Sequence, residues 1–391
     1  MKKILALVLT LCMVFTLCAA AASTDNSDVK IGLFCLHDEN SSYDKNFIDA
    51  FYAACEATGV TPVLKTNIPE DQTAYDASAE LADDGCDLVI GDSYGHQPYI
   101  LEAAMEYPEV QFTSCTGDMA LAEGVENYHN AFASIYEGRF IAGVAAGLKL
   151  NEMIANGEFT AEEAKVGYVG AMRYAEVKSG YTAWYLGVRS VCPTVTMEVT
   201  FTNSWYDETL ENEGANLLIQ NGAKLISQHA DSWGAPNACE KAGVPDVSYN
   251  GSTISACPNT FLISSRIDWT PYFTYAIQAV QNGENFDTDW CGTIETGSVV
   301  LTDVNEAVAA AGTAEKLAEV KAAILDGSLK IFDCSTWTVN GEECTSYLAN
   351  VVPDDAFAPD TEVIIDGCFD ESALRSAPYF DIDIDGITLL G

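Results

Sequence analysis

Apolar runs of strand length alternate with amphipathic segments of helix length along most of the chain. This alternation is typical of parallel β-sheets covered by helices, because a helix carries the chain back to the start of the next parallel strand. In the first part of the chain, the predicted strands are residues 30–36, 62–66, 87–92 and 110–115, and the predicted helices are residues 43–58, 75–83 and 98–107. These elements predict one Rossmann-like lobe.

A long helix predicted over residues 137–153 introduces a second set of the same kind. It is rich in small residues from Ala142 to Gly147, and its charged flanks favour close packing on a sheet over a membrane dimer motif. The predicted strands are residues 165–171, 194–202, 224–228 and 246–250, and the predicted helices are residues 177–191, 208–220 and 236–242. The predicted fold class is therefore α/β, with two Rossmann-like lobes built on parallel sheets.

The pattern becomes less regular toward the end of the chain. A strand at residues 260–265 and a helix at 269–282 indicate that the chain crosses back between the lobes. Helical stretches follow around residues 307–323, and Asn340-Gly341 between apolar residues predicts a β-hairpin. The alternating Asp and Ile of residues 381–386 fit a half-buried strand better than half of a calcium loop.

The first 22 residues have the three parts of a secretory signal peptide. Lys2 and Lys3 precede an uncharged apolar run over residues 4–17, and the alanines at 20–22 fit a cleavage site. A lipid anchor would require a small residue before the acylated cysteine, whereas Leu precedes Cys18, and the apolar run is short for a spanning helix. We expect an exported protein, in the periplasm or on the outer face of the cell membrane, that touches the membrane only through a possible anchor.

The charge of the chain limits its partners. Asp and Glu number 58 against 18 Lys and Arg, which gives a formal net charge of −40. Such a protein repels nucleic acids and anionic lipid surfaces, and phosphate-rich ligands are disfavoured as well. The 391 residues, 48% of them hydrophobic, suffice for two cores. We expect a monomer that binds no nucleic acid.

The sequence predicts no catalytic centre, cofactor or metal site. Of the 13 cysteines, 11 lie beyond the leader without a Cys-x-x-Cys pair, and we interpret most of them as buried packing residues. The four histidines lack metal-ligand spacing. His229, Asp231 and Ser232 are residue types of a hydrolase, but they lie too close together in one loop for a linear relay, and no Gly-x-Ser-x-Gly elbow occurs.

The loops after the predicted strands combine aromatic residues with carboxylates and amides. Ligands of open α/β sheets bind where loops leave the carboxyl ends of the strands. The first of these loops lacks the glycine fingerprint of a pyrophosphate site, whereas rings for stacking and polar groups for hydrogen bonding suit a flat, uncharged ligand such as a purine nucleoside. The loops are residues 37–46, 92–96, 173–176, 203–207, 229–233 and 250–252.

Several segments share their order and spacing with a known family. The most specific are Ser42-Tyr43-Asp44-Lys45-Asn46-Phe47, Tyr136-Glu137-Gly138-Arg139-Phe140-Ile141-Ala142-Gly143, Lys165-Val166-Gly167-Tyr168-Val169-Gly170-Ala171, Leu186-Gly187-Val188-Arg189-Ser190-Val191, Asn203-Ser204-Trp205-Tyr206-Asp207, Gln228-His229-Ala230-Asp231-Ser232 and Trp269-Thr270-Pro271-Tyr272-Phe273. Over residues 30–337 the chain resembles the basic membrane protein (BMP) family of ABC transporter substrate-binding proteins, also called purine nucleoside receptors.

The resemblance implies a type I periplasmic-binding-protein fold, in which two lobes joined by a hinge close on a purine nucleoside or nucleobase and deliver it to an ABC permease. Residues 29–131 plus 259–288 would form the N-terminal lobe. Residues 132–258 plus 289–391 would form the C-terminal lobe, with an acidic C-terminal extension.

The resemblance also implies roles for individual residues. Tyr43 and Trp205 would be the rings that sandwich the base from opposite lobes. The other expected ligand-binding residues are Asp44, Tyr94, Glu176, Asp231, Asn250 and Trp269.

Two positions differ from the family pattern. Asn250 stands where many members have an Asp that grips the ribose hydroxyls, and the lysine that some members aim at the ribose has no match near Arg266. Binding of the base is therefore better supported than binding of the sugar. The alternatives are a sugar or another small signal sensed for a receptor by the same fold, and an exported nucleosidase.

Overall fold

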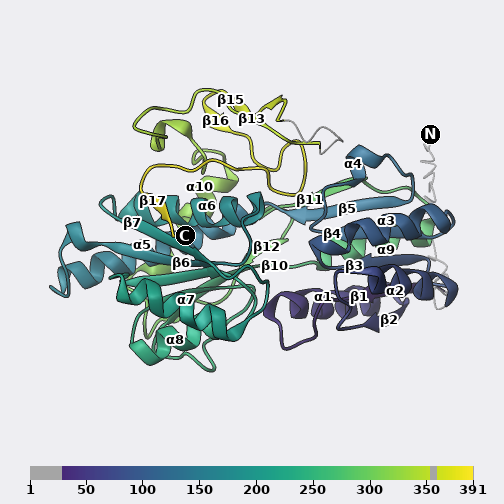
Figure 1. Cartoon of the computed structure of the whole chain (residues 1–391), viewed down its shortest axis with the longest axis horizontal. Coiled ribbons are helices and arrows are strands. Elements are labelled where there is room, and N and C mark those ends of the chain that lie inside the picture. The colour runs from purple at the N-terminus through teal and green to yellow at the C-terminus, as the bar shows by residue number, and fades with distance from the viewer. Residues whose placement is uncertain (1–28, 353–358, 391) are drawn as a thin grey trace, which may run out of the picture.

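Two β-sheets, one in each of two lobes, form the framework of the molecule (Figure 1). The computed structural model describes residues 29–352 and 359–390, so the predicted signal peptide lies outside the described residues. Within the described part, no helix combines the length and apolar character needed to cross a bilayer.

The first lobe holds a six-stranded parallel sheet with the order β11-β5-β4-β3-β1-β2. Strands and helices alternate as the sequence pattern predicts. The elements of this lobe are β1 (Lys30–Phe34), α1 (Ser42–Thr58), β2 (Thr61–Lys65), α2 (Gln72–Asp83), β3 (Leu88–Gly91), η2 (Tyr94–His96), α3 (Gln97–Glu106), β4 (Gln111–Cys115), α4 (Ala120–Glu123), β5 (Tyr128–Ala133), α9 (Thr270–Asn282) and β11 (Asp289–Gly292).

The second lobe holds a seven-stranded sheet with the order β12-β10-β9-β8-β6-β7-β17, in which only β12 is antiparallel to its neighbour among the described strands. Its elements are α5 (Ile135–Ala155), η3 (Ala161–Glu163), β6 (Lys165–Gly170), α6 (Ala175–Val191), β7 (Thr196–Phe201), α7 (Glu208–Gln220), β8 (Leu225–His229), α8 (Gly234–Ala242), β9 (Asp246–Tyr249), β10 (Phe261–Ile267), β12 (Val299–Leu301) and α10 (Thr313–Leu325), with β17 (Ile387–Leu389) added from the end of the chain.

The chain passes between the lobes after β5, after β10 and after β11. The predicted division, with residues 259–288 in the first lobe, is wrong by one strand at each end. β10 lies inside that range but pairs with β9 and β12 in the second sheet, whereas β11 lies beyond it and pairs with β5 in the first sheet. An apolar run identifies a strand but not its partner, because pairing depends on contacts distant in the sequence.

α5 and α6 pack closely because glycines remove side chains from their interface. A Cβ atom on Gly143 would overlap the carbonyl oxygen of Trp184, and one on Gly187 would overlap that of Phe140. The small-residue run therefore packs closely, as predicted, but its glycines at 143 and 147 face the helix α6 and not a sheet. The prediction of buried cysteines is confirmed too: all 11 described cysteines are free thiols, and eight of them are buried.

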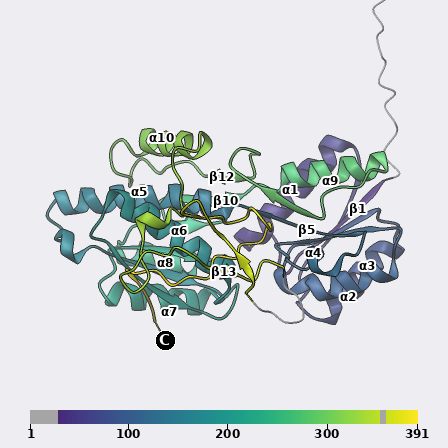
Figure 2. The same cartoon turned by 90° about the horizontal axis from the view of Figure 1, so that it is seen from above.

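Residues 330–352 and 359–390 form a C-terminal extension that lies along the second lobe and reaches the first (Figures 1 and 2). It contains short elements only: η4 (Cys334–Thr336), β13 (Leu348–Ala349), β14 (Thr361–Glu362), β15 (Ile364–Ile365) and β16 (Cys368–Phe369). The predicted turn at Asn340-Gly341 is confirmed, since both residues have positive φ and Val339 pairs with Glu342. The extension has an aromatic core, in which the rings of Phe332 and Phe380 stack 4.5 Å apart.

Candidate functional site

A narrow cavity lies between the lobes, where loops leave the carboxyl ends of the strands of both sheets. We call it the inner cavity. Side chains nearly fill it, and its volume is only about 20 Å³. Its walls are Leu36, Tyr43, Ser93, Tyr94 and Thr116 of the first lobe, and Glu176, Trp205, His229, Asp231 and Tyr249 of the second.

Tyr43 is positioned by the start of α1. Ser41 caps this helix by accepting a hydrogen bond from the backbone N–H of Asp44, which places Tyr43 in the first turn. The Tyr43 hydroxyl donates to the backbone oxygen of Asp92 at 2.5 Å, and its ring lies 5.0 Å from that of Phe47. The ring is therefore fixed from both sides as a wall of the inner cavity.

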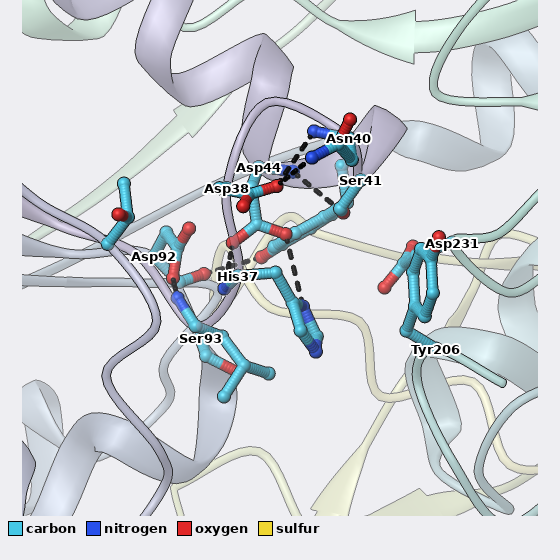
Figure 3. Close-up of polar contacts among 12 residues, drawn as sticks. His37, Asp38, Asn40, Ser41, Asp44, Asp92, Ser93, Tyr206 and Asp231 are labelled. Carbon is cyan, nitrogen blue, oxygen red and sulfur yellow. Dashed lines mark hydrogen bonds and ion pairs between the residues drawn. The ribbon is translucent and has the colours of Figure 1, made fainter.

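Asp44 lies behind that wall and pairs with a second buried carboxyl group, Asp92 (Figure 3). Asp44 accepts from the backbone N–H of His37 at 2.7 Å, and Nδ1 of His37 lies 3.3 Å from its other oxygen. Burial alone would raise the pKa of Asp44, but the hydrogen bonds from His37 and Ser41 outweigh it and lower the pKa. Burial and the charge of Asp44 raise the pKa of Asp92 well above its ordinary value.

The sulfur of Cys35 and one oxygen each of Asp44 and Asp92 lie within 4.8 Å of one another, a spacing that metal ligands can have. Burial raises the pKa of the Cys35 thiol well above its ordinary value, and the neutral thiol is a poor metal ligand. Both oxygens of Asp44 already face hydrogen-bond donors of His37. The cluster is therefore better suited to hold a proton between two carboxyl groups than a metal ion.

On the second lobe, Glu176 and His229 form a hydrogen-bonded pair. Nε2 of His229 lies 3.2 Å from Oε1 of Glu176, so we assign the ring proton to Nε2. Burial lowers the pKa of His229, and the nearby positive charge of Arg139 opposes its protonation further. His229 is thus a neutral donor to a carboxylate at the edge of the inner cavity.

Arg139 itself is fully buried and supports Tyr249 from behind. Its guanidinium carbon lies 3.6 Å from the centroid of the Tyr249 ring, and Nη2 donates to the Tyr168 hydroxyl and to the backbone oxygen of Gln228. Arg139 therefore holds the Tyr249 ring against the inner cavity.

Asp231 and Trp205 come from neighbouring loops joined by a backbone hydrogen bond, from Asp231 N–H to the oxygen of Trp205 at 2.9 Å. Asn250 donates to Oδ1 of Asp231 at 3.2 Å. Burial, with the charges of Asp44, Glu211 and Glu176, raises the pKa of Asp231 well above its ordinary value. In the described residues, no Lys or Arg lines the inner cavity, so the polar side-chain groups of its walls are carboxyl, hydroxyl, imidazole and indole groups.

The lobes touch around the inner cavity, and the structure is closed there. Trp233 donates from its indole nitrogen to Oγ of Ser42 at 3.0 Å, and Asn46 donates to the backbone oxygen of Asn250 at 2.9 Å. The rings of His37 and Tyr206, both labelled in Figure 3, come from opposite lobes. Their centroids lie 5.4 Å apart. These contacts hold the two lobes together beside the inner cavity.

The structure brings most of the expected ligand-binding residues to the inner cavity. Its walls include Tyr43, Tyr94, Glu176, Trp205 and Asp231. Asp44 and Asn250 do not line the cavity. Asp44 accepts a hydrogen bond from the backbone of His37, and Asn250 donates one to the wall residue Asp231. Trp269 lies elsewhere, in the core, where its ring stacks 4.4 Å from that of Phe47.

The expected ligand-binding residues did not include five of the wall residues: Leu36, Ser93, Thr116, His229 and Tyr249. Of these, only Ser93 and His229 lie in loops that the sequence analysis singled out, residues 92–96 and 229–233. His229 and Tyr249 are the last residues of β8 and β9, so their position at the carboxyl ends of strands was a usable signal. Thr116 carries no such signal in the sequence. Its φ of 63° is unusual for a β-branched residue and turns the chain sharply after β4.

Comparisons with known proteins agree with this architecture. A solved ABC transporter solute-binding protein of Aeropyrum pernix matches with a TM-score of 0.65 and 19% identity, covering 77% of this chain and 92% of that one. The fold is therefore the type I periplasmic-binding-protein fold. In this fold, the inner cavity lies between the two lobes and is lined by residues of both.

Residues 36–329 match the family described as ABC transporter substrate-binding protein PnrA-like, and the chain belongs to that family. A purine-binding protein of Brucella abortus is 29% identical over 302 residues, which are 74% of this chain and 80% of that protein. A putative ABC transporter glucose-binding protein of Haloferax volcanii is 32% identical over 218 residues. That match covers 56% of this chain, and the chain spans only 52% of the Haloferax protein's length.

Proposed function

We propose that the protein, exported from the cytoplasm, captures a purine nucleoside or purine base between its lobes and presents it to the permease of an ABC importer. One observation carries the proposal: the inner cavity has aromatic walls from opposite lobes, Tyr43 and Trp205, and carboxyl and hydroxyl groups between them. Aromatic faces stack on a purine ring, and the polar groups hydrogen-bond to its edge. The name of the Brucella relative agrees with this choice.

The absence of Lys and Arg from the described walls of the inner cavity supports an uncharged ligand. A phosphate or carboxylate group placed there would face Glu176 and Asp231 without a compensating cation. Nucleotides are therefore excluded from the proposal, and bases and nucleosides remain.

A sugar is the second candidate, because the Haloferax relative is named as a putative glucose-binding protein. Aromatic rings also stack on sugar faces, so the aromatic walls are compatible with both ligands. The carboxyl groups do not separate them either, since both ligands carry hydrogen-bond donors.

Isothermal titration calorimetry with adenine, adenosine, guanosine, inosine and glucose tests the proposal. We expect at least one purine compound to bind with micromolar or tighter affinity. Trp205→Ala should weaken that binding about 10- to 100-fold, because one stacking face is worth roughly 1–3 kcal/mol per base. The control is Tyr52→Ala on α1, an exposed ring outside the cavity, which should bind like the wild type.

Millimolar or absent binding of all purines, together with tight binding of glucose, would overturn the purine assignment. Chromatography of the nucleoside after long incubation with the protein separates binding from cleavage. We expect the nucleoside to stay intact, and release of free base would identify a nucleosidase instead.

A further inference from the structure

Arg139 of α5 is a fully buried cation whose hydrogen-bonding groups are only partly used. Its Nη2 donates to the Tyr168 hydroxyl and to the backbone oxygen of Gln228, both at 2.7 Å. Its Nε and Nη1 have no hydrogen-bond partner among the described residues. Burial of a charge is costly, so the placement of this arginine behind the inner cavity calls for a role beyond packing against Tyr249.

A second unpartnered polar atom lies next to Arg139. Nδ1 of His229 is also buried without a hydrogen-bond partner in the described part of the chain. Gly180 of α6 allows the two side chains to meet. A Cβ atom at this position would lie 2.8 Å from Nδ1 of His229 and 3.6 Å from Nε of Arg139. The imidazole and the guanidinium therefore both face Gly180, which has no side chain to separate them.

This arrangement suits one protonation state of His229. With the ring proton on Nε2, Nδ1 is an acceptor, which is favourable beside the N–H groups and the positive charge of Arg139. A proton on Nδ1 would place a second donor, and in the imidazolium a second positive charge, against the guanidinium. Burial lowers the pKa of His229 and the charge of Arg139 adds to this effect, although the hydrogen bond with Glu176 opposes it. Arg139 therefore favours the neutral imidazole with its proton on Nε2.

That proton faces Glu176, whose Oε1 lies 3.2 Å from Nε2 of His229. Glu176 belongs to the first turn of α6, where the helix dipole favours a negative charge, and its side chain lines the inner cavity. From β9, the Tyr249 ring packs on the imidazole with its centroid 4.6 Å away. The Glu176 carboxylate is thus held at the cavity by a donor that is itself fixed from behind.

We propose that Arg139 is a positioning residue of the binding site: it fixes His229 with its proton toward Glu176, and His229 holds the Glu176 carboxylate where it accepts a hydrogen bond from the ligand. The contact between Glu176 and the ligand rests on the purine function proposed above. The effect of Arg139 on His229 does not, because it concerns the protein without a ligand.

Nuclear magnetic resonance of the ligand-free protein, labelled with ¹⁵N-histidine, tests the effect of Arg139 on His229. The spectra distinguish protonated from unprotonated ring nitrogens, and the His229→Gln variant identifies the His229 signals among those of the four histidines. For the wild type, we expect a protonated Nε2 and an unprotonated Nδ1 from pH 8 down to pH 5.5. In Arg139→Met the opposing charge is lost, so His229 should become protonated at a higher pH than in the wild type.

Gly180→Ala tests the same contact without removal of the buried arginine, in case Arg139→Met does not fold. The new methyl group would lie 2.8 Å from Nδ1 of His229, so the imidazole must move. We expect the His229 signals to shift and its single protonation state to be lost. The control is Arg189→Gln, which removes a positive charge from α6 where it contacts Thr336, outside the inner cavity. It should leave the His229 signals unchanged.

A double-mutant cycle, measured by calorimetric titration with adenosine, guanosine and inosine, tests the link to binding. Glu176→Gln should weaken binding about tenfold, the loss expected from one hydrogen bond to a charged group. Gly180→Ala should weaken binding several-fold in the wild type but hardly at all in Glu176→Gln, because the arginine acts on the ligand through Glu176. Arg189→Gln should bind like the wild type.

Two results would overturn the positioning role of Arg139. One is a His229 protonated on Nδ1 at pH 7 in the wild type, or His229 signals that neither Arg139→Met nor Gly180→Ala changes. The other is additive losses in the double-mutant cycle, which would indicate a merely structural contribution. Failure of every purine compound to bind would instead overturn the proposed function, and the spectra of the ligand-free protein would still decide the effect of Arg139 on His229.

Discussion

Burial makes ionisation unfavourable for single carboxyl groups around the inner cavity. Glu211 on α7 is fully buried beside the Asp231 loop, and burial raises its pKa from 4.5 to about 7. One of its oxygens accepts from the backbone N–H groups of Asp207 and Ser232, both at 3.2 Å. Its other oxygen has no hydrogen-bond partner in the part of the chain that the structure describes. Ionisation of this side chain in the folded protein therefore lowers the free energy of unfolding.

The free energy of unfolding should fall as the pH rises from about 4.5 to about 7, because a carboxyl group with a raised pKa binds its proton more tightly in the folded state. Glu211→Gln keeps the accepting oxygen and removes the titration. We expect the variant to gain about 2 kcal/mol relative to the wild type between pH 5 and pH 8, at roughly 1.4 kcal/mol per pKa unit. Urea unfolding followed by tryptophan fluorescence at the two pH values measures this gain.

Glu208→Gln, an exposed position on the same helix, is the control and should follow the wild type at both pH values. An equal difference between Glu211→Gln and the wild type at pH 5 and pH 8 would contradict a buried neutral carboxyl at this position.

At the scale of secondary-structure elements, the contact of α5 with α6 depends on two glycines. Gly143→Ala should destabilise the protein by about 2–3 kcal/mol, because the new methyl group would force the helix away from the carbonyl oxygen of Trp184. Thermal denaturation measures the loss. Gly214→Ala on α7 is the matched control. Its Cβ would meet side-chain methyl groups and no backbone, those of Thr200 at 3.1 Å and of Val169 at 3.5 and 3.7 Å, and alanine raises the helix propensity. A similar loss of stability in both variants would contradict the role of the close contact between α5 and α6.

The bond of the extension to the first lobe predicts a kinetic effect. When the lobes open, either the hydrogen bonds between Ser376 and Asp289 break or the C-terminal extension separates from the second lobe. Ser376→Ala removes the hydroxyl donor, so we expect the bound ligand to dissociate several-fold faster in stopped-flow fluorescence. Ser335→Ala is the control, because its hydroxyl bonds only within the extension, to Asp333. Identical dissociation rates in the two variants would exclude a restraint on opening at Ser376.

The sequence predicted the positions of helices and strands along the chain better than it predicted which strands pair with one another. The alternation located the strands of the first 250 residues except β5, because pairing with its sheet neighbours, and not an apolar run, makes residues 128–133 a strand. The positions of β10 and β11 depend on pairing across lobes and were assigned to the wrong sheets.

At the candidate site, too, the sequence did not reveal positions that depend on contacts between distant parts of the chain. Strand-end loops pointed to Tyr43 and Trp205, which do line the inner cavity. The resemblance to a family could not reveal that Trp269 turns into the core against Phe47, or that Arg375, far along the chain, reaches the cleft. Such positions follow from packing over long sequence separations.

For the whole molecule, a net charge of −40 implies strong repulsion between surface groups. Salt screens this repulsion, since the Debye length falls from about 30 Å at 0.01 M to about 8 Å at 0.15 M ionic strength. We therefore expect the melting temperature to rise by several degrees between 10 and 200 mM NaCl, measured by differential scanning calorimetry. Choline chloride at equal ionic strength should give the same rise. A rise with NaCl alone would indicate specific cation binding, and no rise would show that the surface charges are too far apart to matter.

The pairing of β17 with β7 has a consequence for the order in which the protein folds. Residues 387–389 lie beside residues 197–199, so this edge of the second sheet is completed by a strand that follows β7 far later along the chain. Until β17 is in place, the backbone N–H and C=O groups on this edge of β7 are unpaired, and a strand of another chain could pair with them. The exposed edge at β7 can therefore promote aggregation until β17 has been synthesised and has paired with it. A chain that lacks β17 would keep this exposed edge after folding.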